Sequence, residues 1–181
     1  MNPTELYTKQ MLFQSIVETI RGRVIHACID IEFMIDGYIA EHFCNTQDKV
    51  DELASLILMP RVSWNDKVEI FSVLIEKYNK QFNTSYPDYK KDIIDLIEKR
   101  NQFAHFPSNN TIEGIRHFDK TGNIQFLKFK NFKEKVTKDI SYQQKPEYSH
   151  EEIKNYIAAA NKYSKAISLE LRMLKQSIEN P

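Results

Sequence analysis

Apolar residues recur at three- and four-residue steps along most of this chain, and few helix-breaking residues interrupt them. Only four glycines and six prolines occur among 181 residues, which leaves room for long helices. Spacing of this kind is typical of helices that bury one face. The sequence therefore predicts an all-α fold, an antiparallel bundle of five to six helices with a small β-hairpin insertion.

The first half of the chain predicts three helical segments. A helix begins near Thr4, and Gly22 either bends it or splits it in two. Residues 24–43 are apolar on more than one face, which favours a central position in the bundle. A short helix capped by Asp48 ends at Pro60, and a regular apolar stripe predicts the next helix from Trp64 to Tyr78.

The second half predicts two further helices separated by a hairpin. After a polar loop at 81–85, Pro87 opens a helix that Pro107 ends. Two β-favouring runs, 112–118 and 124–130, flank Asp-Lys-Thr-Gly-Asn, so the insertion at about 111–131 is predicted to be a hairpin. Ser149 and Glu152 form a capping-box pair that opens a final helix over about 150–178.

Length and charge narrow the class of protein. A chain of 181 residues predicts a single domain over 1–181. Lysine plus arginine and aspartate plus glutamate each number 25, so no overall field attracts nucleic acid, and any RNA contact must be local. The sequence has no apolar run long enough to predict a membrane span, and no secretory signal is visible. We therefore expect a cytoplasmic protein.

The stretch from Glu98 to Pro107 carries the residues most suited to chemistry. It contains Arg100 and Asn101, then three residues, then His105, at the end of the predicted helix. Asn101 and His105 are four residues apart and share a helix face. The long stem of Arg100 can bring its guanidinium to the same side.

Arginine, four to six residues and then histidine, with a polar residue directly after the arginine, resembles the signature of HEPN domains. Residues 24–43 resemble the first core helix of that family, and residues 63–78 resemble the helix that often follows it. HEPN domains are helical bundles, and many are metal-independent ribonucleases that act as homodimers. The resemblance implies that Arg100, Asn101 and His105 are catalytic, that no cofactor is needed, and that a toxin–antitoxin or phage-defence setting supplies an antitoxin or regulatory protein.

These residue types suit RNA cleavage without a metal. Histidine can carry the proton to or from a reacting oxygen near neutral pH. A guanidinium fits phosphate oxygens, and Asn101 is placed to orient the histidine or the phosphate. Because each chain has one such histidine and the reaction can use two proton carriers, a two-fold dimer completes the site. The products would carry a 2′,3′-cyclic phosphate.

The same residues also have an alternative interpretation, in which their role is structural and not catalytic. His105 is placed to stabilise the last turn of a helix, and Arg100 is placed to pair with Glu98 or Asp95 on the surface. In that case the chain is a non-catalytic HEPN-like module that dimerises and binds RNA or a partner protein. Some HEPN proteins have a modified tyrosine two residues after the histidine, where this chain has Pro107.

Three weaker patterns remain. Residues 116–138 contain seven basic residues, including Arg116, Lys128 and Lys130, with phenylalanines between them. This pattern favours either RNA contact or a solvated hairpin whose rings pack inward. Residue pairs such as His26 and Cys28 lie two apart on a predicted helix and point away from each other, so no metal site is expected. The acidic set Asp30, Glu32 and Asp36 either lines the HEPN cleft or forms a solvated or hydrogen-bonded stripe.

Overall fold

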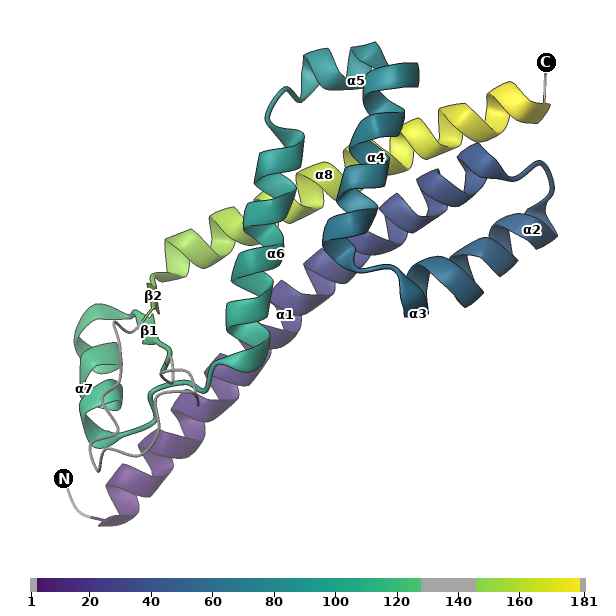
Figure 1. Cartoon of the computed structure of the whole chain (residues 1–181). Coiled ribbons are helices and arrows are strands. Elements are labelled where there is room, and N and C mark those ends of the chain that lie inside the picture. The colour runs from purple at the N-terminus through teal and green to yellow at the C-terminus, as the bar shows by residue number, and fades with distance from the viewer. Residues whose placement is uncertain (1–2, 128–145, 180–181) are drawn as a thin grey trace, which may run out of the picture. The chain divides into compact units, whose positions relative to one another are not determined.

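The computed structural model describes residues 3–127 and 146–179 (Figure 1). The helices are α1 (Pro3–Phe43), α2 (Gln47–Glu52), the π-helical η1 (Leu53–Leu58), α3 (Met59–Arg61), α4 (Trp64–Tyr78), α5 (Lys80–Ser85), α6 (Tyr89–His105), α7 (Ile112–Thr121) and α8 (His150–Glu179). The strands are β1 (Ile124–Gln125) and β2 (Glu147–Tyr148).

The fold is all-α with one small antiparallel sheet, as the sequence predicts. In that sheet Ile124 pairs with Tyr148, and Gln125 pairs with Glu147. The capping box at the start of α8 is also confirmed: the backbone N–H of Ser149 donates to Glu152 Oε2 at 2.7 Å, and the N–H of Glu152 donates to Ser149 Oγ at 3.2 Å. Among the described helices, none is long and apolar enough to cross a membrane.

The hairpin prediction was wrong in its position. Residues 112–118 belong to α7, whose first turn is capped by Thr111 Oγ1 accepting from the N–H of Gly114 at 3.2 Å. Gly122, at φ 73°, ends this helix in the left-handed region instead of turning a hairpin. Only the second predicted run contributes a strand, β1, and its partner is β2, which lies 22 residues later in the chain. Residues 128–130 of that run lie outside the described residues.

The predicted loop at 81–85 is also wrong, because these residues form α5. The side chain of Asn79 caps this helix by accepting from the N–H of Phe82 at 2.9 Å. Phe82 is buried against Phe71 and Tyr89, with ring centroids 5.9 and 5.4 Å away. A local cap and one buried ring thus make a short helix from a polar segment. At Gly22, by contrast, α1 continues without a break.

The chain divides into two compact units. The first contains Met1–Ile25 and Arg100–Tyr156, and the second contains His26–Lys99 and Ile157–Pro181. Helices α1, α6 and α8 each contribute residues to both units.

In the second unit, α4 and α6 run antiparallel, whereas α1 and α8 run in the same direction (Figure 1). Two contacts fix the parallel pair in register: the Gly37 Cα faces the methyl end of Leu171, and Lys175 Nζ lies 2.7 Å from Glu41 Oε1, one turn further along both helices. A Cβ at position 37 would lie 3.1 Å from Leu171 Cδ2, so glycine allows this close approach. The predicted antiparallel arrangement therefore describes α4 and α6 but not α1 and α8.

A buried lysine joins α4 to α1 within the second unit. Lys67 is 0% exposed, and its Nζ lies 2.8 Å from both Glu32 Oε1 and Asp36 Oδ2. Asp36 is 1% exposed, so most of this ion cluster has left water. Two of the three acidic residues noted in the sequence, Glu32 and Asp36, therefore bind one buried lysine instead of forming a solvated stripe, and Asp36 is itself buried. Burial raises the pKa of Asp36 above its usual value, and the nearby Lys67 ammonium opposes that rise.

Replacing Lys67 by methionine should destabilise the fold by about 3–5 kcal/mol, because it leaves Asp36 buried without its cation. The double variant Lys67→Met/Asp36→Leu should recover most of that loss, since the buried charges are removed together. Lys90→Met, which breaks the exposed Lys90–Glu69 pair at 2.7 Å, is the matched control and should change stability by less than about 1 kcal/mol. Urea unfolding measures all three; a neutral Lys67→Met would contradict the expectation.

The loss in Lys67→Met should also depend on pH. Without the ammonium, the folded pKa of Asp36 should lie still further above its unfolded value near 3.8. An acid whose pKa is raised by folding loses stability as pH rises from the unfolded pKa toward the folded one. The difference in unfolding free energy between variant and wild type should therefore be smaller at pH 4 than at pH 7. An equal difference at both values would show that Asp36 is not the cause.

Candidate functional site

The motif residues occupy the last two turns of α6, in the first unit. Arg100 is half-buried, whereas Asn101 and His105 are exposed. Phe103, between them in sequence, turns inward and packs on Phe126 and Tyr148 with ring centroids 5.0 and 4.9 Å away. One buried ring thus anchors the helix end and leaves the polar residues on the opposite side facing solvent.

The structure brings Arg100 and Asn101 into direct contact. Arg100 Nη1 donates to Asn101 Oδ1 at 3.0 Å, which holds the guanidinium on the side of the helix that Asn101 occupies. His105 follows one turn later on that side, as the helical spacing predicts. The three polar side chains therefore share one exposed stretch of α6, where a phosphate can approach from solvent.

The chain that follows His105 is held by the backbone of the next segment. The N–H of Leu127 donates to Pro107 O, and the N–H of Asn109 donates to Gln125 O, each at 2.8 Å. Ser108 forms a β-bridge with Phe126. Because these bonds start two residues after the histidine, they fix the point at which α6 stops.

Two side chains that the sequence did not single out also hold this helix end. Arg21, on α1, donates to the backbone oxygen of Phe106, and its guanidinium lies 5.4 Å from the centre of the Phe126 ring. Tyr148 donates its hydroxyl to Gln102 Oε1, one turn before the helix ends. Burial lowers the pKa of Arg21, which Glu18 partly opposes. Neither contact has a sequence signal, because each joins residues more than 40 positions apart.

Glu147 forms a second polar anchor in this unit, on β2. Its carboxylate accepts from Asn123 Nδ2 at 2.7 Å and lies 2.8 Å from His117 Nε2. The hydrogen bond from Asn123, and then that from His117, lower the pKa of Glu147 below its usual value. These contacts connect β2 to the end of α7.

The basic segment is described only in part. Arg116 and Lys120 are exposed on α7, whereas Lys128 and Lys130 lie outside the described residues, as do the three lysines further along. Two of the interleaved rings pack inward: Phe118 lies 5.1 Å from Phe13, and Phe126 is buried against Phe103. Phe126, which is 0% exposed, is therefore not free to stack on RNA bases, whereas Phe118 is half-buried.

No group of three or more metal-ligating side chains comes together among the described residues. His26 is exposed while Cys28, two residues later on α1, is buried, in line with the opposite directions that helical spacing predicts.

No family model, curated protein or solved structure matches this chain. The assignment of the site therefore depends on its own residues and on the motif.

Arg21→Met should destabilise the fold by about 1–3 kcal/mol, because it removes a charged hydrogen bond and a cation–π contact. Amide exchange at Leu127, whose N–H is bonded to Pro107, should become faster. Arg23→Met is the matched control: Arg23 is exposed two residues later on α1, and its loss should cost less than about 0.5 kcal/mol. Equal effects of the two substitutions would exclude an anchoring role for Arg21.

Proposed function

We propose that this chain is a metal-independent endoribonuclease of the HEPN type, with Arg100, Asn101 and His105 as its catalytic residues. The observation that carries the proposal is the contact of Arg100 Nη1 with Asn101 Oδ1 at 3.0 Å, on the same exposed helix end as His105. A cation that binds phosphate and a group that can carry a proton then face solvent together. The resemblance of the motif to HEPN domains adds the reaction type.

The chemistry is transfer of the phosphodiester within the RNA strand. The 2′-oxygen attacks phosphorus as its proton leaves to a base, and the 5′-oxygen departs as it takes a proton from an acid. A 2′,3′-cyclic phosphate and a free 5′-hydroxyl result. His105 is the proton carrier, and Arg100 stabilises the charge that grows on the phosphate oxygens. Asn101 holds the guanidinium in position.

A homodimer supplies the second proton carrier. One chain offers one motif histidine, whereas the reaction uses both a base and an acid. A two-fold axis that pairs two α6 ends would place two arginines and two histidines at one cleft. The setting that goes with this proposal is the cytoplasm, as a toxin or a phage-defence effector restrained by an antitoxin or regulatory protein.

RNA cleavage in EDTA tests the catalytic assignment. His105→Ala and Arg100→Ala should each lower the cleavage rate at least ~100-fold, the usual scale for losing a proton carrier or a charge-stabilising group. His26→Ala and Lys99→Ala are matched controls at exposed positions and should cut normally. The products of the active proteins should carry cyclic phosphate ends.

Two outcomes would contradict the assignment. If the wild type and all variants are folded and equally inert on varied RNA, the chain is a non-catalytic module that binds RNA or a partner protein. If His105→Ala cuts as fast as the wild type, the activity comes from another site or from a contaminant.

Mixing wild type with His105→Ala tests whether the site is composite. At an equal ratio, random pairing leaves about one quarter of the dimers with two histidines. Cleavage should therefore fall to about a quarter of the rate of the same total amount of wild type. A fall to about half would mean that each chain cuts alone, and would leave the catalytic residues assigned but reject the shared site.

A further inference from the structure

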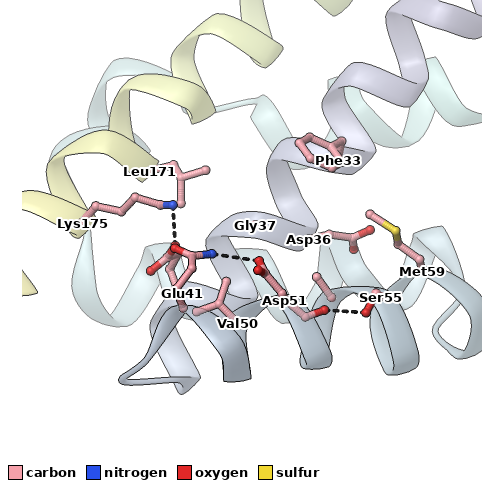
Figure 2. Close-up of a pocket in the computed structure, with 12 residues that line it drawn as sticks. Phe33, Asp36, Gly37, Glu41, Val50, Asp51, Ser55, Met59, Leu171 and Lys175 are labelled. Atoms are coloured by element: carbon pink, nitrogen blue, oxygen red, sulfur yellow. Dashed lines mark hydrogen bonds and ion pairs between the residues drawn. The ribbon is translucent and has the colours of Figure 1, made fainter.

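The second unit contains a cavity of about 380 Å³ between α1, α2, η1, α3 and α8 (Figure 2). This volume is within the usual range for small-molecule sites. Its walls are mostly apolar and include Phe33, Val50, Ala54, Met59 and Leu171. Ala54 comes from the π-helical stretch η1, and π-helical turns are frequent at binding sites.

Asp36, which lines this cavity, has a carboxylate oxygen with no hydrogen-bond partner among the described residues. The residue lines both the cavity and a neighbouring hollow, although it is only 1% exposed. Its Oδ2 binds Lys67 at 2.8 Å, but its Oδ1 is buried and has no hydrogen-bond partner among the described residues. An ionised carboxylate can accept several hydrogen bonds, and leaving a buried acceptor unused is unfavourable. A ligand that donates to this carboxylate would therefore relieve an unfavourable free energy that the fold already carries.

The charge around the cavity is negative. Figure 2 shows Glu41 with Lys175 at one end of the pocket, and Asp36 with Met59 at the other. Lys175 Nζ pairs with Glu41 at 2.7 Å, and Lys67 is shared between Asp36 and Glu32. Three carboxylates, Asp36, Glu41 and Asp51, and one ammonium, Lys175, line the cavity, and Lys67 binds Asp36 from α4.

The mouth of the cavity is apolar and adaptable. Phe33 is 56% exposed and Met59 is 47% exposed, so both side chains are within reach of a ligand that approaches from solvent. An aromatic ring attracts a cation over its face, and the flexible methionine can close on ligands of different shape.

We propose that this cavity binds an organic cation in which a primary ammonium is joined to a short apolar body. The ammonium pairs with the carboxylate of Asp36, which lines the cavity, and the apolar body lies against Phe33, Ala54 and Leu171. A carboxylate ligand would meet the excess negative charge, and a neutral ligand would leave that charge unbalanced. The cation would also favour the ionised form of Asp36, whose pKa burial raises.

Binding of three probes of one length tests the proposal: hexylammonium, hexanol and hexanoate. Titration of the ¹⁵N-labelled protein should show saturable binding of hexylammonium with a Kd near ~1 mM, a reasonable affinity for seven heavy atoms. The shifts should include the amides of Gly37, Ala54 and Leu171. Hexanol should bind at least ~10-fold more weakly, and hexanoate should not bind.

Two variants place the probe in the cavity. Ala54→Phe adds a ring on the η1 wall of the cavity while leaving Asp36 and Lys67 unsubstituted, and it should weaken binding. Its control is Ala158→Phe, at an exposed position of α8. Asp36→Asn keeps the size of the side chain and should weaken binding at least ~10-fold, whereas Asp48→Asn, exposed on the neighbouring α2, should not. Circular dichroism confirms that each variant is folded.

Three results would overturn the proposal. No saturable binding of hexylammonium up to 20 mM would mean that the cavity takes no such cation. Equal binding of hexanol would show an apolar cavity that ignores charge. Binding that is unchanged in folded Ala54→Phe would place the probe elsewhere on the protein. The test does not involve RNA, so it is independent of the proposed ribonuclease activity.

Discussion

The buried ammonium of Lys67 sets the arrangement of the second unit. A charge with no exposed surface must be matched where it lies, and the carboxylates of Glu32 and Asp36 do this from one face of α1. Both carboxylates lie 2.8 Å from the same Nζ, so together they favour the observed position of α4 along α1. The same carboxylate of Asp36 also makes the cavity floor acidic, so the packing of the unit and the polarity of its pocket have one origin.

Much of the helical fold follows from local patterns in the sequence. The stripe of α4 and the Ser149–Glu152 box are local signals, and both elements form where those signals place them. The error at the predicted hairpin arises because one local sequence pattern is compatible with two structures. A glycine at positive φ suits a hairpin turn or a helix end, and at Gly122 it ends α7. The partner of β1 comes from a distant part of the chain, and no local pattern identifies β2.

The candidate site likewise has parts that the sequence predicts and parts that it does not. Helical spacing alone places Arg100, Asn101 and His105 on one stretch of α6, and the Arg100–Asn101 contact agrees with that expectation. The residues that hold the helix end are not foreseeable, because Arg21 and Tyr148 reach it from other elements. The cavity is even harder to predict from the sequence. In the sequence Asp36 is one of several acidic residues on a helix, and neither its unpartnered oxygen nor the cavity that it lines with residues of α2, η1 and α8 has a local signal.

The parallel pairing of α1 and α8 has a consequence for how the protein is made. Gly37 contacts Leu171, and Glu41 contacts Lys175. These contacts of α1 can form only after residues 134 positions later in the chain have been synthesised. During translation the Leu171-facing side of α1 has no partner, although α4 can already reach Asp36 through Lys67. Contacts between distant positions form slowly, and exposed apolar surface invites association in the meantime. The pair of Lys67 with Asp36 can therefore form before α1 meets α8, its last partner along the chain.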